Sequence, residues 1–142
     1  GNYSVFVSSD QPVFATAKAA IGNEGASPRI DFTWLGASEP ISAARAVITS
    51  GIVPPEGASY LVLANPVNEA RSVTVTSLET GVTTVVSVPA QGSASIAITG
   101  ATSLSSESEI FASVALLVSG QISSLAVYQP TNLGNSVQVR FR

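Results

Sequence analysis

The side chains that most often carry out catalysis in proteins are nearly absent from this chain. It contains no histidine and no cysteine, and Lys18 is its only lysine. A serine–histidine or cysteine–histidine pair therefore cannot form, and no Ser-x-x-Lys motif surrounds Lys18. Metal sites built from cysteine or histidine are excluded, and the two aspartates, Asp10 and Asp31, form no Asp-x-Asp loop for calcium. We expect no metal, no cofactor and no enzymatic activity.

Two carboxylates are the best remaining candidates for chemistry. Glu107 and Glu109 lie two residues apart, so they would share one face of an extended segment. Paired carboxylates perform glycoside hydrolysis. These two fall in a predicted turn before an apolar strand, where charged side chains keep a strand end in water. We interpret them as solvated turn residues, with a hydrolase or hydrolase-accessory role as an alternative.

A covalent role for Lys18 is a second hypothesis. A lysine amine can form an amide bond with an asparagine side chain near an acid, releasing one ammonia, about 17 Da. Asn65 or Asn132, together with Glu39, would supply these parts. The alternative is a lysine whose stem lies along a sheet while its ammonium stays in water.

Three aromatic side chains are candidates for carbohydrate binding, because exposed rings on β-sandwiches stack against sugars. The candidates are Trp34, Tyr60 and Tyr128. Trp34 shares its strand face with Ile30 and Phe32, however, and Tyr60 begins an equally apolar strand. Both patterns favour burial between two sheets, so core packing is the competing interpretation of these rings.

Composition excludes two classes of partner. The chain has 142 residues, of which 45% are hydrophobic and 11% charged, with a net charge of −3. Its six cationic side chains are scattered, so no basic patch exists to neutralise nucleic-acid phosphates. No apolar run approaches the ~20 residues of a membrane-spanning helix. We therefore expect neither nucleic-acid binding nor direct membrane insertion of this segment.

The hydrophobic pattern is that of β-strands throughout. Apolar and polar residues alternate with period two in four segments, whose apolar positions point to one face. These segments are 30–34, 72–76, 94–98 and 137–141. Segments 60–64 and 110–118 are apolar on both faces and are predicted central strands. Short turns separate the strands, and two of them end in Gly81 and Gly92. We predict an all-β, antiparallel, immunoglobulin-like β-sandwich of about ten strands with almost no helix.

The chain also repeats itself. Residues 8–16 read SSDQPVFAT and residues 105–113 read SSESEIFAS. Self-similarity at a domain-sized interval predicts tandem modules. We assign residues 1–43 to the terminal strands of a first β module, which either stand alone or pack into the same sandwich. Residues 44–142 then form a second module.

Several stretches resemble a known group of proteins. They are YLVLANP at 60–66, the strand-rich segment 73–98, and the repeated segments near residues 8 and 105. In these stretches the chain is similar to an uncharacterised family of actinobacterial envelope proteins, secreted or membrane-anchored and built from tandem β-sandwich repeats. The resemblance implies an extracellular or cell-surface location. It brings no catalytic residues and no ligand.

Together these observations predict a non-catalytic structural, adhesive or spacer module of a cell-envelope repeat protein. Its partners would be neighbouring modules of the same chain, and either a cell-wall polysaccharide or another envelope protein. The alternative function is a carbohydrate- or cell-wall-binding module that uses an exposed aromatic side chain.

Overall fold

A computed structural model describes residues 4–22, 30–41, 46–49, 57–118 and 120–127 of the chain. Within these ranges it contains ten β-strands and no helix, so no helix there is long and apolar enough to cross a membrane. The strands are β1 (Thr16–Gly22), β2 (Ile30–Gly36), β3 (Ala46–Thr49), β4 (Gly57–Ala64), β5 (Arg71–Ser77), β6 (Thr83–Val88), β7 (Ser93–Ile98), β8 (Ala101–Ser106), β9 (Phe111–Val118) and β10 (Gln121–Ala126). The predicted all-β class and strand number are confirmed.

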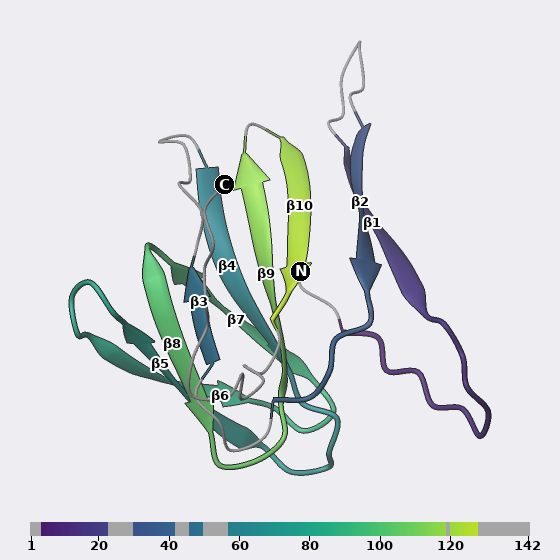
Figure 1. Cartoon of the computed structure of the whole chain (residues 1–142), viewed down its shortest axis with the longest axis horizontal. Helices are drawn as coiled ribbons and strands as arrows, with labels where there is room; N and C mark the ends of the chain where they lie inside the picture. Colours follow the sequence, from purple (N-terminus) through teal and green to yellow (C-terminus); the bar gives the residue numbers. More distant parts are fainter. Residues whose placement is uncertain (1–3, 23–29, 42–45, 50–56, 119, 128–142) are drawn as a thin grey trace, which may run out of the picture.

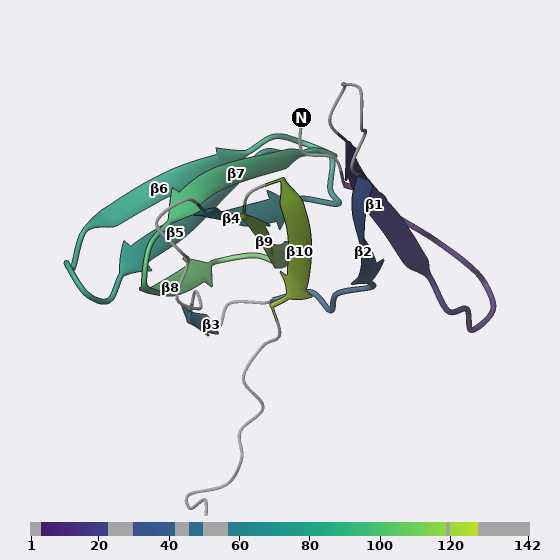
Figure 2. The same ribbon diagram turned by 90° about the horizontal axis from the view of Figure 1, so that it is seen from above.

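Eight strands form a sandwich of two antiparallel sheets. One sheet has the order β10-β9-β4-β7 and the other the order β3-β8-β5-β6 (Figure 1). β4 and β9 have strands on both sides, as predicted from the apolar residues on both faces of segments 60–64 and 110–118. The view from above separates the sandwich from a third, two-stranded sheet, the β1–β2 hairpin (Figure 2).

The core lies between the two four-stranded sheets and follows from the period-two pattern. Val73 and Val75 on β5 point inward and are buried, and Thr74 between them faces outward. β7 repeats this arrangement, with Ile98 buried beside the partly buried Ile96. The largest fully buried apolar side chains are Ile41, Leu61, Leu63, Leu104, Ile110, Val73 and Val88.

The sandwich has the inner pairing of the immunoglobulin class, with its terminal strands exchanged. β4 pairs with β7 and β5 with β8, which matches the pairing of strands B with E and C with F in immunoglobulin domains. The strand before β4 would then be expected beside β4, and the strand after β8 beside β8. Instead β3 pairs with β8, and β9 pairs with β4. Each terminal strand therefore lies in the opposite sheet.

Glycine has a different role in each of the two predicted turns. Gly81, after β5, has a φ of 72° and is the left-handed residue that the prediction required. In the β6–β7 turn the left-handed residue is Gln91, with a φ of 47°, rather than Gly92. Gly92 is needed for another reason, because a Cβ there would lie 2.8 Å from the Cγ of Pro89.

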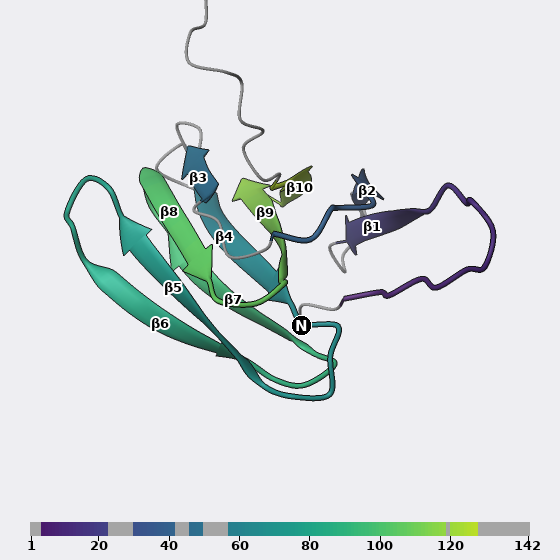
Figure 3. The same cartoon turned by 60° about the horizontal axis from the view of Figure 1, so that its bottom comes forward.

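The β1–β2 hairpin stands beside the free edge of β10 (Figure 1). The Ile122 backbone N–H donates a hydrogen bond of 2.7 Å to Oδ2 of Asp31. Residues 4–15, which precede β1, loop out beyond the hairpin (Figure 3). Ile41 follows the hairpin, pairs with Ile110 and is completely buried. The part of the chain that packs into the sandwich core therefore includes Ile41, which precedes β3.

Candidate functional site

An aromatic face on the β1–β2 hairpin is the clearest candidate site. Along both strands, exposed residues alternate with half-buried ones. The antiparallel register places Lys18 opposite Trp34 and Ala20 opposite Phe32, all on the exposed face. Trp34 is 61% exposed and Phe32 is 49% exposed. Two large rings therefore lie two residues apart on a strand, with a lysine opposite one and an alanine opposite the other.

Lys18 gives this face its only charge among the residues that the structure describes there. Its ammonium Nζ lies 4.2 Å from the centroid of the Phe32 ring and 6.0 Å from that of Trp34. Such cation–π contacts at exposed sites contribute about 0.5–1 kcal/mol each. The contacts hold the flexible lysine stem against the rings. Its ammonium remains at the surface, where it can donate hydrogen bonds to a ligand.

The exposure of these rings corrects the core interpretation of the strand that ends near Trp34. The pattern Ile-Asp-Phe-Thr-Trp suggested an apolar inner face, but Phe32 and Trp34 face outward, and Asp31 and Thr33 are half-buried. The physical reason is the size of the sheet. A two-stranded sheet has no second layer of its own, and the face that it turns to the sandwich carries Asp31, which satisfies the Ile122 amide.

Phe32 was not among the binding residues proposed from the sequence. Its pattern with Trp34 is indistinguishable from that of a core strand until the register with β1 is known. The sequence did contain a signal that this face is exposed. It lies in the segment that pairs with this strand, where Lys18 is surrounded by alanines. A lone lysine on one face of an alanine-rich strand indicates that the face is solvated.

The other candidate residues are scattered over the molecule. Tyr60 is half-buried on the outer face of β4, between Ala97 and Ala115. Tyr128 lies outside the described residues. The structure therefore does not bring Tyr60 into the Lys18–Trp34 face, since Tyr60 belongs to the four-stranded sheet and Trp34 to the hairpin.

The residues proposed for a lysine–asparagine bond are not assembled either. Lys18 lies on the exposed hairpin face. Asn65 is completely buried beyond the end of β4, where its Nδ2 donates hydrogen bonds to three backbone carbonyls. Glu39 is exposed, and Asn132 lies outside the described residues. The Asn65 amide is thus fully engaged away from Lys18.

Glu107 and Glu109 are both exposed, in the segment that joins β8 to β9. Neither glutamate lines the cleft described below. No group of three or more aspartates or glutamates capable of holding a metal occurs among the described residues. This placement agrees with the interpretation of the two glutamates as solvated turn residues.

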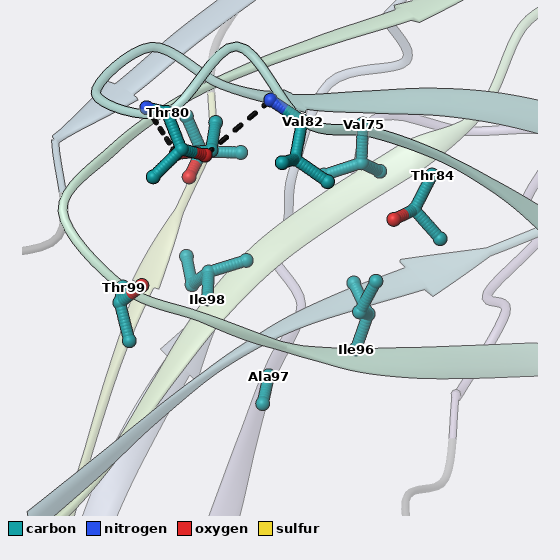
Figure 4. A pocket seen from close by; sticks show the side chains of 10 residues that line it. Val75, Thr80, Val82, Thr84, Ile96, Ala97, Ile98 and Thr99 are labelled. Atoms are coloured by element: carbon teal, nitrogen blue, oxygen red, sulfur yellow. Dashed lines mark hydrogen bonds between the residues drawn. The ribbon is translucent and has the colours of Figure 1, made fainter.

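A shallow cleft lies between the β5–β6 turn and β7 (Figure 4). Its volume is about 280 Å³, and its lining includes Val82, Thr84, Ile96 and Ile98. Figure 4 also shows the hydroxyl of Thr80 accepting a hydrogen bond from the Val82 N–H, at 3.3 Å. No acidic or basic side chain lines the cleft, so it offers no group for acid–base chemistry.

The hydrogen bond from Ile122 to Asp31 gives a testable prediction about how the hairpin is attached to β10. Replacing Asp31 with alanine removes the acceptor of the Ile122 N–H, so the amide should exchange its hydrogen roughly tenfold faster or more. The measurement is residue-resolved hydrogen exchange. Asp31→Asn, which keeps a side-chain oxygen acceptor, is the matched control and should retain most of the protection. Equal exchange in the alanine variant and the unchanged protein would contradict this role of Asp31.

Comparison with known proteins gives one match. The model of a family of unknown function (DUF5719) matches residues 1–99, a range that includes the hairpin and the strands up to β7. No match was found among curated proteins or solved structures.

Proposed function

The chain belongs to this family of unknown function, and we propose that it is a non-catalytic module that binds a polysaccharide through the β1–β2 hairpin. The binding surface is the exposed face with Lys18, Phe32 and Trp34. The observation that carries the proposal is the 61% exposure of the only tryptophan, beside a second exposed ring and an ammonium group.

The chemistry of this face suits a sugar chain. The C–H face of a sugar ring is apolar and packs against the electron-rich face of an aromatic ring. Lys18 and the hydroxyl of Thr16 share the exposed face and can bond to sugar hydroxyls. β1 has seven residues, so the face is roughly 20 Å long at the ordinary rise of a strand. A surface that is long, narrow and open favours a linear glycan over a small enclosed ligand.

We place this binding module in an extracellular or cell-envelope repeat protein. The proposal is supported by the resemblance of segment 60–66 to actinobacterial envelope proteins and by the internal repeat. The sandwich would serve as the structural or spacer part, holding the hairpin away from its anchor. The hairpin would supply the adhesive contact, and a cell-wall polysaccharide is the partner of choice.

The test is a titration of the intrinsic fluorescence with cell-wall polysaccharide and peptidoglycan fragments. One tryptophan makes the signal specific to this face. We expect a red-shifted emission that changes saturably with at least one fragment. If no fragment changes the emission, Trp34 is not a sugar-binding residue, and the spacer role is left as the proposal.

Substitutions locate the binding energy. Trp34→Ala should weaken binding, measured by calorimetry, by roughly tenfold or more, as for an aromatic residue at the centre of an interface. Leu78→Ala is the control, because Leu78 is an exposed apolar residue in the β5–β6 turn. Equal losses in the two variants would mean that the affinity is not specific to the hairpin face.

A further inference from the structure

The repeated sequence corresponds to a repeated structure. Residues 8–16 precede and begin β1, and residues 105–113 precede and begin β9. With Phe14 matched to Phe111, six consecutive pairs of the β1–β2 register coincide with the six pairs of the β9–β10 register. Leu35 then corresponds to Leu125, and Thr33 to Ser123. The β1–β2 hairpin is therefore a second copy of the β9–β10 hairpin.

The β9–β10 copy shows what such a hairpin needs on its other side. The edge of β9 that faces away from β10 is fully occupied by β4, which pairs with it over eight residues from Gly57 to Ala64. Just before β9, Ile110 pairs with Ile41 and is completely buried. Phe111 is half-buried, with its ring 6.3 Å from that of Phe6.

The β1–β2 copy lacks all of this cover within the described residues. Among the residues that the structure describes, β1 pairs with β2 alone. Val13, the counterpart of the fully buried Ile110, is 58% exposed. Phe14, the counterpart of Phe111, is completely exposed. Apolar residues that are retained in both copies, but buried in only one, indicate a missing neighbour at β1.

From this comparison we infer that the free edge of β1 binds a β4-like strand from a preceding repeat of the same polypeptide. The strand precedes because β4 comes before β9 in the chain. The register follows from the copy: the residue equivalent to Val62 lies opposite Thr16, and the one equivalent to Tyr60 lies opposite Lys18. This is strand addition to an exposed sheet edge.

Nothing on β1 blocks this addition. A lysine on an edge strand normally discourages pairing, but the Lys18 side chain leaves the outer face of the hairpin and rests on the Phe32 ring. On the other, half-buried face of β1 the side chains include the small Ala17 and Ala19, so neither face carries a bulky group that would hinder an added strand. The added strand would also leave the face with Phe32 and Trp34 open, so the inference is independent of polysaccharide binding.

The absence of cysteine from the chain allows a direct test of both occupant and register. The probe is a peptide with the sequence of Gly57–Ala64, flanked by arginines for solubility and carrying Val62→Cys as an activated disulfide. It is mixed with the full chain carrying Thr16→Cys or, as the matched control, Ala20→Cys. Both positions are exposed on β1, so both variants should fold. Cross-linking is followed by intact mass.

We expect the Thr16→Cys variant to cross-link at least about tenfold faster than Ala20→Cys, because residues directly opposite one another meet the geometry of a disulfide. In the inferred register Ala20 faces the position of Ala58, roughly 13 Å along the strand from Val62. Hydrogen exchange at residues 13–21 should slow when the unmodified peptide is added. Equal rates for the two variants, equal rates with a scrambled peptide, or no cross-link at all would overturn the inference.

Discussion

Replacing Asn65 with alanine is expected to lower the free energy of unfolding by about 3 kcal/mol. Asn65 is completely buried where the chain leaves β4. Its Nδ2 donates hydrogen bonds to the carbonyl oxygens of Glu69 at 2.7 Å, Pro89 at 3.0 Å and Val88 at 3.3 Å. Its Oδ1 accepts one from the Val67 N–H at 3.2 Å. Alanine would leave these buried or part-buried backbone groups without their partner, and each such group costs about 1–3 kcal/mol unless water reaches it.

The large effect follows from what Asn65 joins together. Glu69 belongs to the β4–β5 connection, whereas Val88 and Pro89 lie at the end of β6 and the start of the next turn. A single side chain therefore links two connections at one end of the sandwich. The Asn65 backbone N–H adds a fourth donation there, to the carbonyl of Gly92 at 2.9 Å.

Chemical denaturation followed by far-ultraviolet circular dichroism measures this change. Asn68→Ala is the matched control, because Asn68 has the same side chain in the same connection and is exposed. Its effect should be about 0.5 kcal/mol or less. A loss below about 1 kcal/mol for Asn65→Ala would mean that water replaces the amide without cost.

The strands could be predicted from the sequence because most of them bury one face and expose the other, which gives alternating apolar and polar residues. In β5, Val73 and Val75 alternate with Thr74 and Thr76, and this alternation identifies both the strand and its apolar face, which packs inward. The apolar run of β9 likewise identified a central strand. The exchange of the terminal strands was beyond prediction, because β3 and β9 carry no local signal of which sheet they join.

Individual residues of the candidate site could be predicted from the sequence, but not that they lie together on one surface. Trp34 was identified as a candidate platform, and Lys18 as an isolated lysine, in separate arguments. Only the register of β1 with β2 brings them together, and register is a property of two segments rather than one. The direction of Trp34 was missed because the period-two pattern identifies the apolar face of a strand, and on the two-stranded hairpin that face is exposed rather than covered by a second sheet.

The second large effect is expected in β4. Leu61→Ala should lower the free energy of unfolding by about 3–4 kcal/mol, since Leu61 is completely buried in a central strand and alanine leaves a cavity. Leu125→Ala is the matched control because the Leu125 side chain is exposed on β10. It should cost about 0.5 kcal/mol or less. A loss below about 1 kcal/mol for Leu61→Ala would contradict the packing of β4 between β7 and β9.

The choice of probe for Leu61→Ala follows from the exposure of Trp34. Trp34 is already exposed in the folded protein, so its emission should change little on unfolding, and circular dichroism must report the transition. An isolated two-stranded hairpin is marginally stable at best. The β1–β2 hairpin should therefore lose its structure with the sandwich. The hydrogen of the Ile122 amide should then exchange faster in the Leu61→Ala variant, by a factor set by the loss in the free energy of unfolding.

A glycan that binds the hairpin would then stabilise the whole molecule, because binding to the folded state alone raises the free energy of unfolding. In the Leu61→Ala variant, saturating glycan should recover part of the lost stability, and Trp34→Ala added to that variant should abolish the recovery.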